Sequence, residues 1–184
     1  MILYVVRHGE TQFNVERRYA GQTDVPLNER GIEQAKELVR KLEGEPFDII
    51  VTSSLLRARM TAEQVAEYHK EIPFVVMEEF REVCVGVYEG LTREEVQVRY
   101  PELWVRNCTR QVDDAPTGGE TTRQVDSRVA EGLAILKEKY PEKRVLLVCH
   151  GFVSRAINRQ LKGLSFEEMH EFSLGNCEVV QYEL

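Results

Sequence analysis

The sequence predicts an α/β fold, and within that class a three-layer α/β/α sandwich with a mostly parallel central sheet. Continuous apolar runs, such as residues 2–7 and 144–149, are typical of strands buried on both faces of a sheet. Amphipathic helical patterns alternate with these runs along the chain. No low-complexity stretch, long linker or repeat divides the 184 residues, so we expect a single domain over residues 1–184.

The first half of the chain is expected to supply three strands and two helices. Residues 2–7 form the first strand, and Asn28 begins the first helix. The apolar positions of this helix recur at spacings of three and four residues: Ile32, Ala35, Val39 and Leu42. A second strand lies within "FDIIVTS", a second helix begins near Ser54, and "IPFVVM" forms a third short strand.

The second half repeats the alternation of helices and strands. Thr92 with Glu95, and Thr121 with Gln124, have the spacing of capping boxes that begin helices. The turn-rich segment "DDAPTGGE" separates these two helices, and Pro141 ends the second. The strand "RVLLVC", a further helix ended by a glycine, and "CEVVQYEL" as an edge strand then complete the expected fold.

Composition limits the classes of partner. The formal net charge of −7 argues against nonspecific binding to nucleic acid or to anionic membranes, but a small anionic substrate depends only on local charge. The first apolar run meets Arg7 too early for a signal peptide or a membrane span. The four widely spaced cysteines fit reduced thiols, so we expect a cytoplasmic protein. No pattern predicts the oligomeric state.

Two His-Gly corners follow two of the apolar runs. His8 and His150 each come directly after a predicted strand. In open α/β sheets, ligands bind beyond the carboxyl ends of the strands, so the two histidines would meet there if their strands are neighbours. Arg7 can hold a phosphate and would favour neutral His8, and neutral imidazole can act as a nucleophile. We therefore expect His8 and His150 to meet over one phosphate.

The second corner adds hydrogen-bond donors. His150 can donate to a phosphoryl oxygen, and Gly151 offers a backbone N–H where the next helix begins. The remaining two histidines, His69 and His170, lie in predicted helical segments among charged residues and are expected to face solvent.

Two other chemistries compete for the same residues. Cys149 and Arg155 have the C-x5-R spacing of cysteine phosphatases, in which a thiolate of low pKa attacks phosphate. The alternative is that Cys149 is the buried last residue of a strand and that Arg155 lies on the outer face of the helix. A catalytic metal held by two histidines and a carboxylate lacks the usual H-x-x-x-H or HExxH spacing, so we expect neither metal nor cofactor.

Six segments in order resemble the histidine phosphatase superfamily, in its phosphoglycerate mutase-like branch. They are "RHGETQFN", "GQTDVPLNERGIEQA", "SSLLRARMTA", "FREVCVGVYEGL", "TGGET" and "VCHG", which span nearly the whole chain. Each segment alone is a weak signal, whereas their joint order is specific. The resemblance departs at Phe13, where Trp is usual, and at Asn28, where Thr is usual; Asn caps a helix equally well.

The resemblance implies a role for each matching residue. His8 would take the phosphoryl group as a phosphohistidine, and Glu82 would protonate the leaving alcohol and then activate water. The phosphoryl oxygens would be surrounded by Arg7, Arg57, a protonated His150 and Asn14. The substrate would be bound by Gly21 and Gln22 at the entrance, with Gly151 and Phe152 beside it.

A phosphatase fits the sequence better than the related mutases. The mutases of this family carry a longer insertion before the Gly-rich loop, whereas a short segment joins Gly90 to "TGGET" here. Val85 and Phe152 stand where the mutases tend to have Tyr and Asn. We expect hydrolysis of small phosphomonoesters, such as sugar phosphates, phosphoglycerate, phosphoserine or α-ribazole phosphate. A phosphoglycerate mutase and a non-catalytic binding module remain the alternatives. The expected lining residues are Val85, Tyr88, Trp104 and Phe152.

Overall fold

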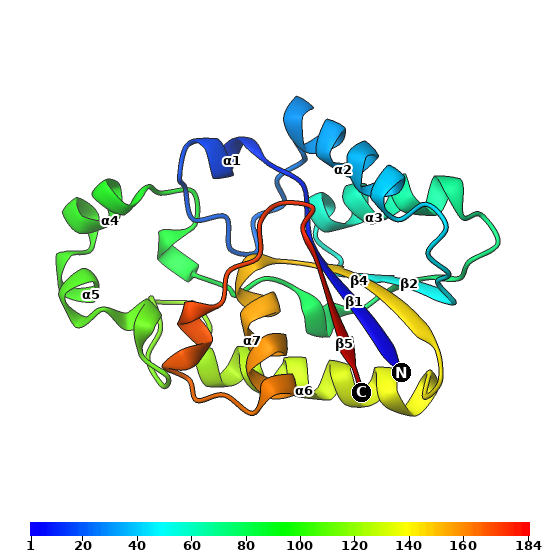
Figure 1. Cartoon of the computed structure of the whole chain (residues 1–184). Coiled ribbons are helices and arrows are strands. Elements are labelled where there is room, and N and C mark those ends of the chain that lie inside the picture. The colour runs from blue at the N-terminus through cyan, green and yellow to red at the C-terminus, as the bar shows by residue number, and fades with distance from the viewer.

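Five strands form one sheet in the computed structural model, which describes residues 1–184 (Figure 1). Their order across the sheet is β3-β2-β4-β1-β5. The strands are β1 (Ile2–Arg7), β2 (Ile49–Thr52), β3 (Phe74–Val76), β4 (Arg144–Cys149) and β5 (Val179–Glu183). All neighbouring pairs are parallel except β1 with β5. The predicted fold class and the predicted edge strand at the C-terminal end are therefore confirmed.

The register of the two central strands brings the His-Gly corners together. Arg7 at the end of β1 pairs with Cys149 at the end of β4. The next residue of each strand is a histidine, and the backbone N–H of His8 donates to the carbonyl of Cys149 at 3.0 Å. The two histidines thus leave the same edge of the sheet side by side, as the sequence predicted.

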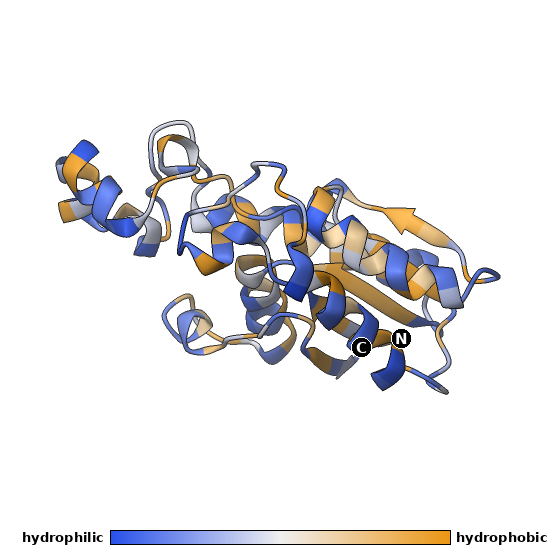
Figure 2. Cartoon of the chain, turned by 90° about the horizontal axis from the view of Figure 1, so that it is seen from above, coloured by the Kyte–Doolittle hydropathy of each residue, from blue (hydrophilic) through white to orange (hydrophobic).

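Helices cover both faces of the sheet. One face packs against α2 (Glu29–Lys41) and α3 (Leu56–Tyr68), whose small residues Ala35, Ala58 and Ala62 are completely buried. The other face packs against α6 (Thr122–Lys139) and α7 (Gly151–Lys162). Figure 2 shows the apolar strands enclosed between helices whose outer surfaces are polar, which is the pattern of a three-layer sandwich.

Three predicted helix starts are confirmed by their capping bonds, whereas α3, predicted to begin near Ser54, begins at Leu56 without a side-chain cap. The side chain of Asn28 accepts from the backbone N–H of Gly31 at 2.8 Å. The capping boxes at Thr92 and Thr121 are both closed. Gly163 ends α7 with a φ of 66°, a left-handed conformation that glycine adopts without steric cost.

The segment between β3 and α6 forms a separate lobe beyond the carboxyl ends of the strands (Figure 1). It contains α4 (Arg93–Arg99) and α5 (Pro101–Arg106), and α1 (Gln12–Val15) lies near it. Its own apolar cluster consists of Val85, Tyr88, Val96 and Cys108, with partly buried aromatic residues around them. The short helices α1 and α5 were not predicted, because each is too brief to show a periodic pattern. No helix has both the length and the apolar character needed to cross a lipid bilayer.

Candidate active site

His8 is held as a neutral imidazole whose proton is on Nδ1. The residue is buried, with only 3% of its surface exposed, and its Nδ1 lies 2.7 Å from the carbonyl oxygen of Gly9. Because a carbonyl only accepts, Nδ1 carries the proton and Nε2 carries the lone pair. Burial, together with the nearby cations Arg57 and Arg7, holds the pKa of His8 well below 6.5. This is the protonation state that a nucleophile requires.

Arg57 donates a hydrogen bond to the unprotonated nitrogen of His8. This arginine lies in the first turn of α3 and is almost fully buried. Its Nε donates to His8 Nε2 at 3.3 Å, and its two terminal nitrogens donate to the carbonyls of Thr23 and Gly21 at 3.0 and 2.8 Å. A guanidinium has five N–H groups, so two remain available for an anion.

His150 lies beside His8 at the start of α7. The ring centroids of the two histidines are 5.2 Å apart. His150 is completely buried, its Nε2 is 2.8 Å from Ser53 Oγ, and its Nδ1 has no partner in the protein. Burial, followed by Arg57 and His8, keeps the pKa of His150 well below 6.5. These causes disfavour the charged ring in the protein alone, whereas the expected protonated His150 concerns the complex with a phosphoryl group.

Arg7, Gly151 and Glu82 converge on one point of the site. Arg7 donates to the carbonyl of Leu174 at 3.0 Å, and its buried Nε has no partner. A Cβ placed on Gly151 would lie 3.6 Å from this Nε and 4.0 Å from Glu82 Oε2. Glu82 itself accepts from the backbone N–H of Phe152 at 3.2 Å. The carboxyl group and the guanidinium thus face the same space beside Gly151.

The loop that carries Glu82 is anchored by an arginine that the sequence analysis did not identify. Arg128, on α6, donates to the carbonyls of Glu79, Arg81 and Glu82 at 2.8, 2.6 and 3.1 Å. The same guanidinium binds the carboxylate of Glu120 at 2.8 and 3.0 Å. No pattern in the sequence distinguishes Arg128 from Arg123, the other arginine of α6.

Gly21 and Gln22 act differently from the expectation. Neither belongs to the lining of the cavity above the site. The carbonyl of Gly21 accepts from Arg57. Gly21 has a φ of +49°, which favours glycine, and a Cβ at this position would meet the carboxylate of Glu89. Gln22 Nε2 donates to the carbonyl of Glu82 at 3.0 Å. Both residues therefore position the site rather than line its entrance.

An open cavity of about 510 Å³ leads to this site. It is reached by five of the predicted site residues: Arg7, Asn14, Glu82, Gly151 and Phe152. The side-chain oxygen of Asn14 is occupied by the backbone N–H and hydroxyl of Thr11 at 3.0 and 3.1 Å, so its NH₂ group is free to donate. His8, Arg57 and His150 do not line the cavity and are buried next to the residues that do.

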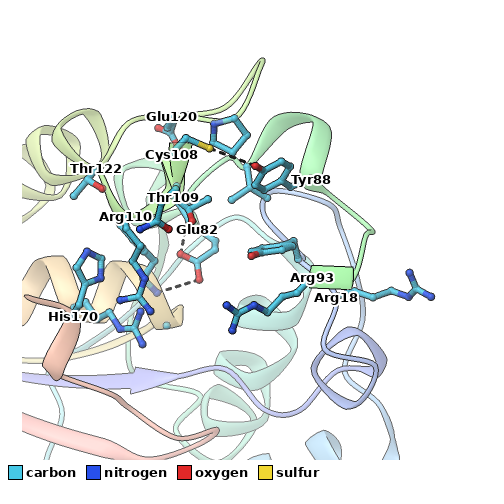
Figure 3. A pocket seen from close by; sticks show the side chains of 18 of the residues that line it. Arg18, Glu82, Tyr88, Arg93, Cys108, Thr109, Arg110, Glu120, Thr122 and His170 are labelled. Atoms are coloured by element: carbon cyan, nitrogen blue, oxygen red, sulfur yellow. Dashed lines mark hydrogen bonds between the residues drawn. The ribbon is translucent and has the colours of Figure 1, made fainter. Parts of the chain in front are cut away.

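The walls of the cavity combine apolar and cationic side chains (Figure 3). All four expected lining residues, Val85, Tyr88, Trp104 and Phe152, belong to it. His170 also lines the cavity, so the expectation that it faces solvent is wrong. Its segment folds back over α7, a long-range arrangement that no local sequence pattern indicates.

The thiolate alternative does not fit the geometry. Cys149 is completely buried at the end of β4, and burial raises the pKa of its thiol, which is the opposite of an activated cysteine. Arg155 is half-buried and lines the cavity, instead of lying on the outer face of α7.

Two histidines of lowered pKa, two arginines and a carboxylate gather near one edge of the sheet, a combination suited to binding a small oxyanion. A family model described as the histidine phosphatase superfamily (branch 1) matches residues 3–184, and the chain belongs to this family. It is 38% identical over 159 residues to an uncharacterized phosphatase, PhoE, of Bacillus subtilis, covering 86% of this chain and 76% of that protein.

Two further relatives bear on the fold and on the choice of reaction. A 2,3-bisphosphoglycerate-dependent phosphoglycerate mutase 2 of Gloeobacter violaceus is 32% identical over 186 residues, covering 99% of this chain and 85% of the mutase. The crystal structure of the α-ribazole phosphatase from Shigella flexneri superposes with a TM-score of 0.93 at 30% identity. That match covers 100% of this chain and 91% of the other.

Proposed function

We propose that residues 1–184 form one catalytic domain that hydrolyses small phosphomonoesters through a phosphohistidine on His8, without a metal ion. The observation that carries the proposal is the state of His8, whose Nδ1 proton is bound by the Gly9 carbonyl and whose Nε2 lone pair accepts only a long hydrogen bond of 3.3 Å from Arg57, which an entering phosphate can replace. Arg7 and Arg57 supply positive charge around the phosphoryl oxygens, which phosphoryl transfer requires.

In the first step, His8 Nε2 attacks phosphorus and forms a P–N bond while the P–O bond to the alcohol breaks. Glu82, entering as the carboxylic acid, gives its proton to the departing oxygen. The hydrogen bond from Nδ1 to the Gly9 carbonyl stabilises the positive imidazole ring of the intermediate.

In the second step, Glu82 takes a proton from water, and the water oxygen attacks phosphorus. The P–N bond breaks, its electron pair returns to Nε2, and inorganic phosphate leaves. Glu82 is again protonated and His8 is again neutral, so the cycle closes with no net change in the protein.

Hydrolysis is favoured over mutase chemistry by the surroundings of the site. A mutase must retain its phosphorylated intermediate, reorient it and exclude water. Here the cavity above Glu82 is open, and the apolar residues Val85 and Phe152 line it. The four cysteines are all free thiols, which supports our proposal of a cytoplasmic location.

The test is hydrolysis of p-nitrophenyl phosphate in excess EDTA, with His8→Ala and Cys149→Ser measured alongside. We expect turnover that survives EDTA and Cys149→Ser but is lost in His8→Ala. Rapid quenching with radiolabelled substrate should trap phosphate on the protein in an acid-labile, base-stable form, as a phosphohistidine requires. Loss of activity in Cys149→Ser with survival in His8→Ala would overturn the proposal, and phosphoglycerate isomerisation faster than hydrolysis would favour the mutase.

A further inference from the structure

The sheet places a buried serine, Ser53, beside His150. Strands β2, β4 and β1 are neighbours (Figure 1), and the residues that directly follow them are Ser53, His150 and His8. The backbone N–H of Ser53 donates to the carbonyl of Val148 at 3.1 Å, which continues the pairing of β2 with β4. Ser53 is completely buried, and the reaction proposed above gives it no part.

The hydroxyl of Ser53 contacts two groups. Its Oγ lies 2.8 Å from Nε2 of His150 and accepts from the backbone N–H of Leu55 at 3.3 Å. A hydroxyl has one proton and two lone pairs, and the N–H of Leu55 uses one lone pair. No acceptor other than His150 Nε2 lies within hydrogen-bond distance of this oxygen. Because a buried donor without an acceptor is costly, the hydroxyl of Ser53 donates to Nε2.

This hydrogen bond determines where the neutral His150 ring carries its own proton. A ring nitrogen that accepts a hydrogen bond has no proton, so Nε2 has the lone pair and Nδ1 has the proton. Nδ1 is buried and has no partner within the protein, which leaves its N–H available for a ligand. The ring centroids of His150 and His8 are 5.2 Å apart, so this donor lies close to the nucleophile.

The two histidines have opposite partners and therefore opposite roles. Nδ1 of His8 lies against a carbonyl, which only accepts, and this leaves a lone pair on Nε2 for attack on phosphorus. Nε2 of His150 lies against a hydroxyl that donates, and this leaves a proton on Nδ1. A carbonyl in place of the Ser53 hydroxyl would leave a lone pair on Nδ1, which would repel an anion. Because a hydroxyl can also accept, Nε2 can still take up a second proton when an anion binds.

We propose that Ser53 is a positioning residue that fixes the neutral His150 ring with its proton on Nδ1, where the N–H can donate to an oxygen of a bound phosphoryl group. Ser53 acts through the ring and does not itself bind the substrate. The inference deepens the proposed function and rests on it for the use of this donor. The position of the proton depends only on the hydrogen bonds around Ser53, so it can be tested without turnover.

Nuclear magnetic resonance of the full chain labelled with ¹⁵N-histidine tests the position of the proton directly. Long-range correlations between ring protons and ring nitrogens show, for each ring, whether Nδ1 or Nε2 is protonated. Above neutral pH, the wild type should show His8 and His150 protonated on Nδ1, and His150→Asn identifies the signals of the second ring. A wild-type His150 ring protonated on Nε2 would refute the proposal, whatever the variants do.

Variants test whether Ser53 selects this form of the ring. In Ser53→Ala no hydroxyl donates to Nε2, so part of the His150 population should carry its proton on Nε2, while His8 keeps its proton on Nδ1. Ser53→Thr retains a hydroxyl and should restore the wild-type pattern. The matched control is Ser154→Ala, which removes another buried serine hydroxyl, one that donates to the carbonyl of Gly151 instead of a histidine ring. A His150 proton that stays on Nδ1 throughout in Ser53→Ala would show that Ser53 does not select it.

Anion binding measures the functional consequence. In titration calorimetry, Ser53→Ala should bind tungstate about two- to tenfold more weakly than the wild type, as expected for the loss of one net hydrogen bond. Ser53→Thr and Ser154→Ala should bind tungstate as the wild type does. Equal affinities of Ser53→Ala and the wild type would contradict the use of this donor. If these results are obtained but His8→Ala still hydrolyses p-nitrophenyl phosphate, the role of Ser53 stands and the proposed function fails.

Discussion

Replacing Arg128 by Gln would show how far the acid–base group depends on its anchor. The substitution removes five hydrogen bonds, three to the loop that ends at Glu82 and two to the carboxylate of Glu120. Breaking a buried ion pair by removing one partner costs about 3–5 kcal/mol. The side chains of Arg128 and Glu120 keep 19% and 24% of their surface in solvent, so water would compensate in part and we expect about 3 kcal/mol.

The catalytic consequence is expected to be larger for poor leaving groups. Displacement of a catalytic group by about 1 Å can reduce a rate by about 100-fold. An alkoxide needs the proton of Glu82 to depart, whereas p-nitrophenolate leaves without it. In Arg128→Gln, kcat should therefore fall by about 100-fold for glycerol 3-phosphate and much less for p-nitrophenyl phosphate.

The assay combines urea unfolding with kcat on both substrates. Glu82→Gln should show the same dependence on the leaving group, which identifies Glu82 as the group that Arg128 positions. The matched control is Arg123→Gln, on the same helix and paired with exposed Asp113, which should change neither quantity appreciably. If Arg128→Gln loses stability but slows both substrates equally, the reasoning fails and Arg128 has a purely structural role.

Three further predictions concern protonation and backbone strain. Because burial and nearby cations lower the pKa values of His8 and His150 below 6.5, the unfolded chain binds more protons at acid pH. The contribution of the two neutral rings to the free energy of unfolding is complete above about pH 6.5 and is lost as pH falls, by at most about 1.4 kcal/mol per pH unit for each ring. Urea unfolding from pH 7.5 to 5 measures this loss. In His8→Asn, the free energy of unfolding should fall less steeply with decreasing pH. Binding of tungstate, a dianion, should raise the pKa of His150, so that the protein takes up protons when the anion binds. Calorimetry in buffers of different ionisation enthalpy measures the number of protons taken up. An uptake of zero would contradict the prediction. Gly21→Ala should destabilise the protein more than Gly44→Ala in urea unfolding. Both positions have positive φ, so alanine costs about 1–2 kcal/mol at each, but only Gly21 has a carboxylate, that of Glu89, against it. Equal losses of stability would show that the Glu89 side chain moves away freely.

Local signals in the sequence predicted the sheet and the longer helices. Apolar runs identify strands because both faces of a covered sheet must be buried, and the capping boxes at Thr92 and Thr121 specify helix starts through bonds spanning three residues. The short helix α1 has a closed capping box between Thr11 and Asn14, and α5 begins at Pro101, but neither helix is long enough to show an apolar period. The helix α5 packs through Leu103 and Trp104 onto the cluster around Tyr88, a contact that its local sequence does not indicate.

The site residues also differ in whether a local sequence signal or a long-range contact determines their position. The two histidines could be placed together because each follows a strand, and strands of one parallel sheet end at the same edge. The roles of Arg57 and Glu82 came from the resemblance to a family. Arg128 and His170 escaped prediction because the loop carbonyls that bind Arg128 lie 46 or more residues away, and because His170 reaches the cavity only through a folded-back turn.

The protonation of His150 depends on what surrounds its ring. Its sequence position gives no measure of burial, and complete burial next to Arg57 holds the pKa of the ring below its ordinary value in the protein alone. A phosphate dianion entering between the guanidinium groups reverses the sign of the local field and offers an acceptor for the unpartnered Nδ1. In the proposed reaction, His150 would therefore gain its proton as the phosphate binds, while His8 stays neutral for its attack on phosphorus.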